Sequence, residues 1–218
     1  MSDNRPPLDP HPLSEYVAWA GNRNRGPILE ILKQELPDDA GDVLEFASGS
    51  GMHINYFAPH FRHLTFYPSD KDQEVFENIE TLAGKHGNEN ISKPTHLDLT
   101  RRETWQHLQP HSFAAIYCIN IFQVAPISIA DGMMECASYL LQDDGFLMIY
   151  GPFRVEGQFT TDSNREFHET LSSYQVPEWG LKDVADLQKA AAKFGLELKK
   201  QIGMPANNFS LIFAKGSV

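Results

Sequence analysis

One run of residues combines an acid with small residues in a pattern that suits a nucleotide-sized ligand. The apolar segment 43–46 contains Glu45, and the small residues 47–51 follow it directly. Backbone in such a turn can approach a ligand closely, because glycine has no Cβ and adopts positive φ angles freely. Asp70 comes nineteen residues after Gly51, and in nucleotide-binding α/β folds an acid at this place accepts hydrogen bonds from ribose hydroxyls. The spacing predicts an adenosine-type site.

Alternating strand and helix patterns must position these residues. We expect strands at 43–46, 64–67, 95–97, 113–119, 146–150, 196–202 and 209–214. We expect helices from Pro27 to 36, at 52–58, from 73, at 101–108, from 129, around 167–174 and at 183–194. Pro27 is placed at the first helical position, where its missing N–H costs nothing. The last two strands have no helix between them and must be antiparallel.

A repeated strand–helix pattern predicts parallel strands with right-handed crossovers and helices on both faces. The expected fold is a doubly wound, mostly parallel seven-stranded sheet with an antiparallel last strand. We expect residues 1–25 to form an N-terminal arm and residues 26–218 a single domain, since no linker interrupts the pattern. Ligands in such sheets bind beyond the carboxyl ends of the strands, which directs attention to Asp70, Asp98 and Asn120.

The order of elements and the turn resemble class I S-adenosylmethionine-dependent methyltransferases. The strand-one motif of that family is an acid followed by three glycines at alternate positions. Glu45, Gly49 and Gly51 match it, whereas Ala47 replaces the first glycine. We expect this departure to be mild, with Ala47 at a negative φ.

The resemblance implies S-adenosylmethionine as cofactor and a role for each matching residue. Glu45 would lie near the methionine amino group, Gly49 and Gly51 against the adenosine, and Asp70 on the ribose. Asp98 would reach the adenine amino group, and the Asn120 region would line the methionine end. Simpler roles stay open, because the turn could only pack a helix on a strand. Asp98 could cap the helix expected at 101–108, and Asn120 could satisfy backbone groups at a strand end.

The chain also resembles an uncharacterised, mainly bacterial family of methyltransferase-like proteins. The segments that carry this resemblance are 22–29, 68–70, 118–120, 150–153 and 204–208. They strengthen the expected fold and say nothing of the methyl acceptor.

Candidate substrate contacts follow from the expected topology. They come from the N-terminal segment, the end of the fifth strand and the last loop: Tyr16, Arg23, Tyr150, Arg154 and Asn208. Either arginine could pair with a carboxylate of the cofactor or of the substrate, or be an ordinary solvated side chain. The amide of Asn208 could instead serve a tight turn. His53, next to the turn, is the one histidine placed where it could take part in a site, although we expect a surface role for it.

Composition excludes several classes of protein. The net charge of −11 argues against nucleic-acid binding, which needs clustered Lys and Arg. We expect the two cysteines to be buried thiols. The spacing of the histidines predicts no metal site. Without a signal peptide or membrane span, a cytoplasmic location is expected.

The predicted function is methyl transfer from S-adenosylmethionine to a small-molecule acceptor, with no catalytic residue identified. A non-catalytic module that binds the cofactor and acts with a partner enzyme is an alternative. A nicotinamide-dependent oxidoreductase is a second one, although Ile54 stands where its fingerprint needs glycine. The acceptor and the oligomeric state stay open.

Overall fold

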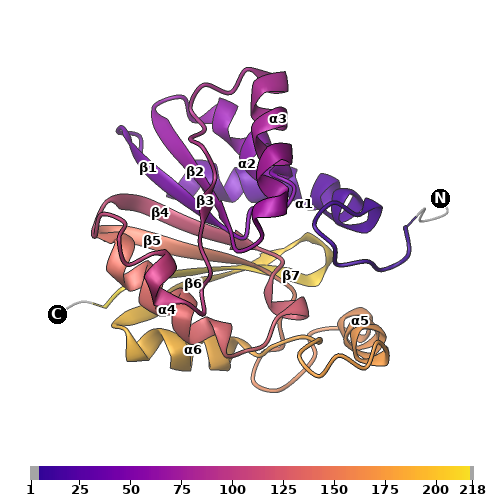
Figure 1. Cartoon of the computed structure of the whole chain (residues 1–218). Helices are drawn as coiled ribbons and strands as arrows, with labels where there is room; N and C mark the ends of the chain where they lie inside the picture. Colours follow the sequence, from indigo (N-terminus) through magenta and orange to yellow (C-terminus); the bar gives the residue numbers. More distant parts are fainter. Residues whose placement is uncertain (1–4, 217–218) are drawn as a thin grey trace. The chain divides into compact units, whose positions relative to one another are not determined.

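The computed structural model describes residues 5–216 and divides the chain into two compact units, with His96 ending the first and Leu97 beginning the second (Figure 1). The strands are β1 (Gly41–Phe46), β2 (Leu64–Asp70), β3 (Thr95–His96), β4 (Phe113–Ile119), β5 (Leu141–Gly151), β6 (Leu196–Met204) and β7 (Asn208–Lys215). Their order in the sheet is β3-β2-β1-β4-β5-β7-β6. Within the units, β1, β2 and β3 pair in parallel, as do β4 and β5, and β7 is antiparallel to β5 and β6. These findings confirm the predicted fold class.

The first unit contains α1 (Glu15–Glu35), α2 (Met52–Phe57) and α3 (Phe76–His86). Short 3₁₀ turns follow α2 at Ala58–His60 and precede α3 at Gln73–Val75. Asn90, beyond α3, donates its side-chain amide to the carbonyls of Ala58, Phe61 and Leu64. This single side chain therefore holds the end of α2 and the start of β2 in place.

The first helix begins twelve residues earlier than the Pro27 start that the sequence predicts, so residues 15–25 are helical and do not form an arm. Ser14 caps it by accepting a hydrogen bond from the Val17 amide, which supplies the start signal. Pro27 lies inside the helix. Its ring removes one backbone hydrogen bond, and burial of residues on both sides of it, from Gly21 to Leu32, offsets that loss.

The second unit contains α4 (Ile129–Leu140), α5 (Asp162–Ser173) and α6 (Val184–Lys193). A Cβ added at Gly132 would lie 1.8 Å from the carbonyl oxygen of Leu99, so α4 packs directly on the segment after β3. The helix expected at 101–108 is only a 3₁₀ turn, Arg102–Thr104. Strand β5 begins at Leu141 and not at 146, because Phe113 pairs with Leu141 before the register shifts.

Both strands of the final hairpin match the prediction of an antiparallel pair. Since β7 is antiparallel to β5 and to β6, the latter two run in the same direction. Gly151 pairs with Phe209, which places the 3₁₀ turn Pro205–Asn207 beside the carboxyl end of β5. No helix within residues 5–216 is long and apolar enough to cross a membrane.

Candidate functional site

The small-residue turn after β1 takes an unusual backbone path. Positive φ angles occur at Ala47 (53°), Gly49 (52°) and Gly51 (75°). The prediction of a negative φ at Ala47 is therefore wrong. The left-handed conformation costs a residue with a Cβ about 1–2 kcal/mol, so Ala47 carries strain that a glycine would avoid.

Hydrogen bonds from β2 hold this turn in shape. The Ser48 amide donates to the Ser69 carbonyl at 2.9 Å, and the Ser69 amide donates to Ser48 Oγ at 3.1 Å. Ser69 Oγ in turn donates to the Glu45 carbonyl at 2.6 Å. The path of the turn is thus set by the protein's own contacts.

Asp70 is the last residue of β2 and supports the turn through its carboxylate. Its Oδ2 accepts from the Gly49 amide and its Oδ1 from the Asp72 amide, each at 2.9 Å. A carboxylate offers about four lone-pair sites, so capacity for ribose hydroxyls remains after these two bonds. Glu45, only 2% exposed, lies one residue from the end of β1. The first unit therefore brings Glu45, Gly49 and Asp70 together, and their donor and acceptor set fits an adenosine with an amino-acid tail.

Asparagine side chains, which the sequence did not single out, secure the helix that follows the turn. Asn55 Nδ2 donates to the Gly51 carbonyl at 2.9 Å, and Asn78 Nδ2 donates to the Ser50 carbonyl at 2.6 Å. A Cβ on Gly51 would meet Ile79 Cγ1 at 2.9 Å and Ile79 Cα at 3.0 Å. Helix α3 thus packs against a turn that only glycine fits.

His53 is half-buried and not a surface residue as predicted. Its Nε2 lies 2.8 Å from Oδ1 of the buried Asn24, in α1. Burial and then the positive charge of Arg25 lower the pKa of His53 to about 4. The imidazole is therefore neutral at pH 7, and Nε2 donates to the Asn24 oxygen.

The other predicted contacts of the first unit lie on α1. Tyr16 accepts a hydrogen bond from Arg5, and the Arg23 guanidinium lies 4.5 Å from the centre of the Trp19 ring. A cavity of about 1180 Å³ in this unit reaches the turn only at Ser50. Residues 5–216 contain no group of three or more His, Cys, Asp or Glu side chains arranged to hold a metal.

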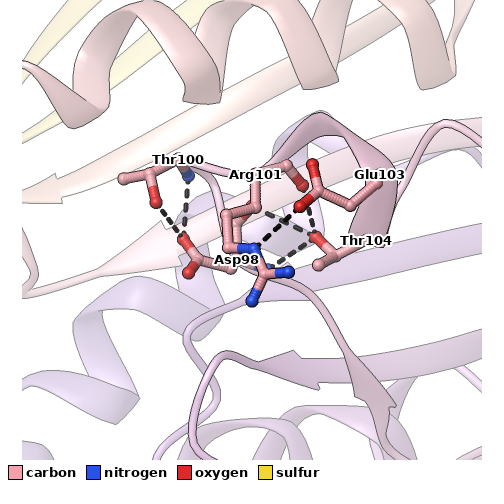
Figure 2. A network of polar contacts seen from close by, with 5 residues as sticks. All are labelled: Asp98, Thr100, Arg101, Glu103 and Thr104. Atoms are coloured by element: carbon pink, nitrogen blue, oxygen red, sulfur yellow. Dashed lines mark hydrogen bonds and ion pairs between the residues drawn. The ribbon is translucent and has the colours of Figure 1, made fainter.

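Asp98, in the second unit, stabilises a turn (Figure 2). Its Oδ1 accepts from the backbone amide of Thr100 at 2.8 Å and from Thr100 Oγ1 at 2.7 Å. Thr104 Oγ1 closes the same turn by donating to the Arg101 carbonyl at 2.7 Å. Asp98 does not cap the 3₁₀ turn Arg102–Thr104, whose N-cap position is Arg101 and carries no side-chain cap; its carboxylate stabilises the preceding turn at Thr100. A role on adenine stays a prediction.

Asn120 and the predicted contacts near β5 lie at one edge of the second unit. The Asn120 amide donates to the Tyr150 carbonyl at 2.9 Å, and Asn120 has a positive φ of 58°. Tyr150 is 2% exposed. Asn208 donates its side-chain amide to the carbonyls of Pro205 and Ala206, as the alternative role in a tight turn requires.

Solved structures of methyltransferases match this chain over most of its length. Mitomycin 7-O-methyltransferase MmcR matches with a TM-score of 0.74 at 10% identity, over 92% of this chain and 56% of that one. An O-methyltransferase family protein from Burkholderia thailandensis gives 0.74 at 13%, over 93% and 60%. CalO1, a methyltransferase in calicheamicin biosynthesis in its SAH-bound form, gives 0.71 at 15%, over 93% and 58%. The chain spans less than two thirds of the length of these proteins, and the likeness confirms the class I methyltransferase fold.

A family model also matches the sequence, across residues 15–215. Its description is a protein of unknown function, DUF938, which agrees with the predicted resemblance to an uncharacterised family. The match covers all seven strands and all six α-helices of the described structure. The chain therefore belongs to the DUF938 family of proteins of unknown function.

Proposed function

We propose that this chain transfers a methyl group from S-adenosylmethionine to a small-molecule acceptor. The observation that carries the proposal is the turn 47–51, whose shape is fixed by the buried carboxylate of Asp70 and which follows the buried Glu45. A preformed turn lowers the entropy cost of binding, because few groups must be ordered when the ligand arrives.

Each residue has a binding role in this proposal. Glu45 receives the amino group of the methionine moiety, and Gly49 admits the adenosine close to the backbone. Asp70 accepts from the ribose hydroxyls while it keeps its bonds to Gly49 and Asp72. Asp98 and Asn120 remain the proposed contacts for the adenine amino group and the methionine end.

When bound, the cofactor supplies an electrophilic methyl group on a sulfonium. The protein has to align the acceptor atom with that carbon and exclude water. A general base is required only where the acceptor must lose a proton early, and we assign none. Tyr16, Arg23, Tyr150, Arg154 and Asn208 are the proposed acceptor contacts. A cytoplasmic location and a partner set without nucleic acid or membrane belong to the same proposal.

Isothermal titration calorimetry tests cofactor binding. S-adenosylmethionine and S-adenosylhomocysteine should each bind one site per chain. Asp70→Ala should weaken binding by about 1.5–3 kcal/mol, the cost of deleting a charged hydrogen-bond partner. Asp72→Ala is the matched control, since among residues 5–216 the Asp72 carboxylate accepts only from the nearby Glu74 amide. Equal losses in both variants would contradict the role of Asp70.

Two alternatives predict different outcomes. A nicotinamide-dependent oxidoreductase would bind a nicotinamide dinucleotide and give no heat with the sulfonium cofactor. The structure supplies one observation against it: Ile54, where that fingerprint needs glycine, is fully buried in α2. A non-catalytic binding module would bind the cofactor yet methylate nothing until a partner chain is added, whereas the proposed enzyme methylates an acceptor alone.

A further inference from the structure

Three basic side chains lie near one aromatic ring in the segment after β5, and a fourth basic residue, Lys182, is bonded to one of them through the backbone. The Arg154 and Arg165 guanidinium carbons lie 6.0 and 5.8 Å from the centre of the Phe159 ring, and the His168 ring centre lies 5.1 Å away. The backbone of Arg154 bonds to that of Lys182, whose carbonyl accepts from the Arg154 amide at 2.8 Å. We call Arg154, Arg165, His168 and Lys182 the cation cluster.

Arg154 is held rigidly but its charge is not neutralised. Its carbonyl also accepts from the Val184 amide at 3.0 Å, so its backbone is fixed on both sides. Its Nε is buried and has no hydrogen-bond partner among the described residues. The ion pairs found within residues 5–216 do not include Arg154, His168 or Lys182. Burying the Nε donor of a guanidinium without a hydrogen-bond partner is costly.

No neighbouring acid within residues 5–216 forms an ion pair with Arg154, His168 or Lys182. The Asp183 carboxylate accepts from the amides of Gly157 and Ala185, at 2.6 and 2.9 Å. Asp162 is almost fully exposed and lies 3.8 Å from Arg165. Glu169 and Glu178 act on His168 and Lys182 respectively, and in each case the effects that lower the pKa prevail.

The pKa directions agree with an excess of positive charge. Burial and then the charges of Arg154 and Lys182 lower the pKa of His168. Burial and then the charge of Arg154 lower the pKa of Lys182. With the pKa of His168 below its usual 6.5, the positive charge near neutral pH comes from Arg154, Arg165 and Lys182. In a chain with a net charge of −11, such a group of cations marks a place where an anion would be stabilised.

The cluster lies at the edge of the sheet where α/β proteins bind ligands. Strands β4 and β5 are parallel, and Ile119 pairs with Tyr150 near their carboxyl ends. The turn after β4 reaches the cluster, because the Gln123 carbonyl accepts from the Gly180 amide at 2.9 Å, two residues before Lys182. The carboxyl ends of strands are the usual ligand edge in such sheets.

We propose that the cation cluster binds a carboxylate or phosphate group of the methyl acceptor, with Arg154 as its principal contact. The guanidinium is planar and suits either anion through paired hydrogen bonds. Both guanidinium groups lie about 6 Å from the centre of the Phe159 ring, within reach of a cation–π interaction. The identification of the ligand as the methyl acceptor rests on the proposed function. Anion binding at the cation cluster does not depend on it.

Anion binding by the full chain tests the site directly, in the absence of cofactor. Calorimetry with inorganic phosphate and with citrate should show binding at millimolar concentration, and both should raise the Tm of the wild-type chain. Arg154→Gln should weaken either anion by about tenfold or more and abolish the Tm increase. Without anion, its Tm should equal or exceed that of the wild type, because a guanidinium whose buried Nε has no hydrogen-bond partner has been removed. Lys189→Gln, which removes an exposed charge on α6, is the matched control and should behave as the wild type.

Three results would overturn the assignment. One is a wild-type chain that binds neither phosphate nor citrate, and another is an Arg154→Gln chain whose Tm falls without anion, which would indicate a structural role. The third concerns the source of the anion. If Arg154→Gln weakens S-adenosylhomocysteine but leaves 5′-methylthioadenosine unchanged, the bound carboxylate belongs to the cofactor. Failure of the proposed function alone would appear as phosphate binding without any cofactor binding.

Discussion

Gly51→Ala should destabilise the first unit, and the structure separates the loss into a backbone cost and a steric cost. The positive φ of 75° costs alanine about 1–2 kcal/mol. The new Cβ would lie 2.9 Å from Ile79 Cγ1 and 3.0 Å from Ile79 Cα, and relieving a contact with backbone adds about 1–3 kcal/mol. Alanine also lowers the conformational entropy of the unfolded chain, which raises the free energy of unfolding by about 0.4–1 kcal/mol. The expected net loss in the free energy of unfolding is about 1–4.6 kcal/mol.

Chemical denaturation followed by circular dichroism measures this loss, and two other glycines separate its causes. Gly49 has a similar φ of 52° but its Cβ would meet only Pro12, at 3.4 Å, so Gly49→Ala should cost about 1 kcal/mol or less. Gly84 lies in α3 with nothing within 4 Å of a new Cβ, and Gly84→Ala should stabilise by about 0.5–1 kcal/mol. The reasoning is refuted if Gly51→Ala costs no more than Gly49→Ala, since the Ile79 contact would then be irrelevant.

Further predictions concern other parts of the chain. Ala47→Gly should raise the free energy of unfolding by up to about 1 kcal/mol, because it relieves strain at a φ of 53°; a loss in a denaturant titration would contradict this. Gly132→Ala should cost about 3 kcal/mol or more, since its Cβ would lie 1.8 Å from the Leu99 carbonyl oxygen, and its Tm should fall accordingly. The lowered pKa of His53, about 4 against 6.5, means that neutral His53 stabilises the protein fully above pH 6.5 and loses this contribution as the pH falls toward 4. The gap corresponds to at most about 3 kcal/mol, and His53→Gln should flatten the pH dependence of unfolding over that interval.

Sequence patterns predicted the elements well where local signals and tertiary packing agree. Strand β4 is a continuous apolar run bounded as predicted, and α6 begins after Asp183 and ends before Gly195 because cap and stop residues are unambiguous. The start of α1 was wrong because Pro27 imitates a helix start, while the true cap, Ser14, lies within a polar, proline-containing segment. A single chain does not reveal that burial on both sides of Pro27 continues the helix.

Site residues were harder to predict, because their roles depend on contacts between segments far apart in the sequence. The motif located Glu45, Gly49 and Asp70, but the bond from the Gly49 amide to Asp70 joins residues twenty-one apart. The φ of Ala47 follows from the bonds that hold the turn to β2, which spacing does not encode. The sequence identified Arg154 as a possible partner of a carboxylate. That Arg165, His168 and Lys182 lie near it depends on how α5 and the loop after it fold back, which the sequence does not show.

The place of β7 between β5 and β6 has a consequence for how the chain folds during synthesis. Strand β6 touches no strand of the second unit except β7, which is made after it. Until Lys215 has left the ribosome, β5 presents an open edge of unpaired backbone groups, and β6 has nothing to pair with. Such edges promote aggregation. The sheet of this unit therefore closes only after β7 has been made, and a nascent chain stalled after Met204 would depend on chaperones more than its size suggests.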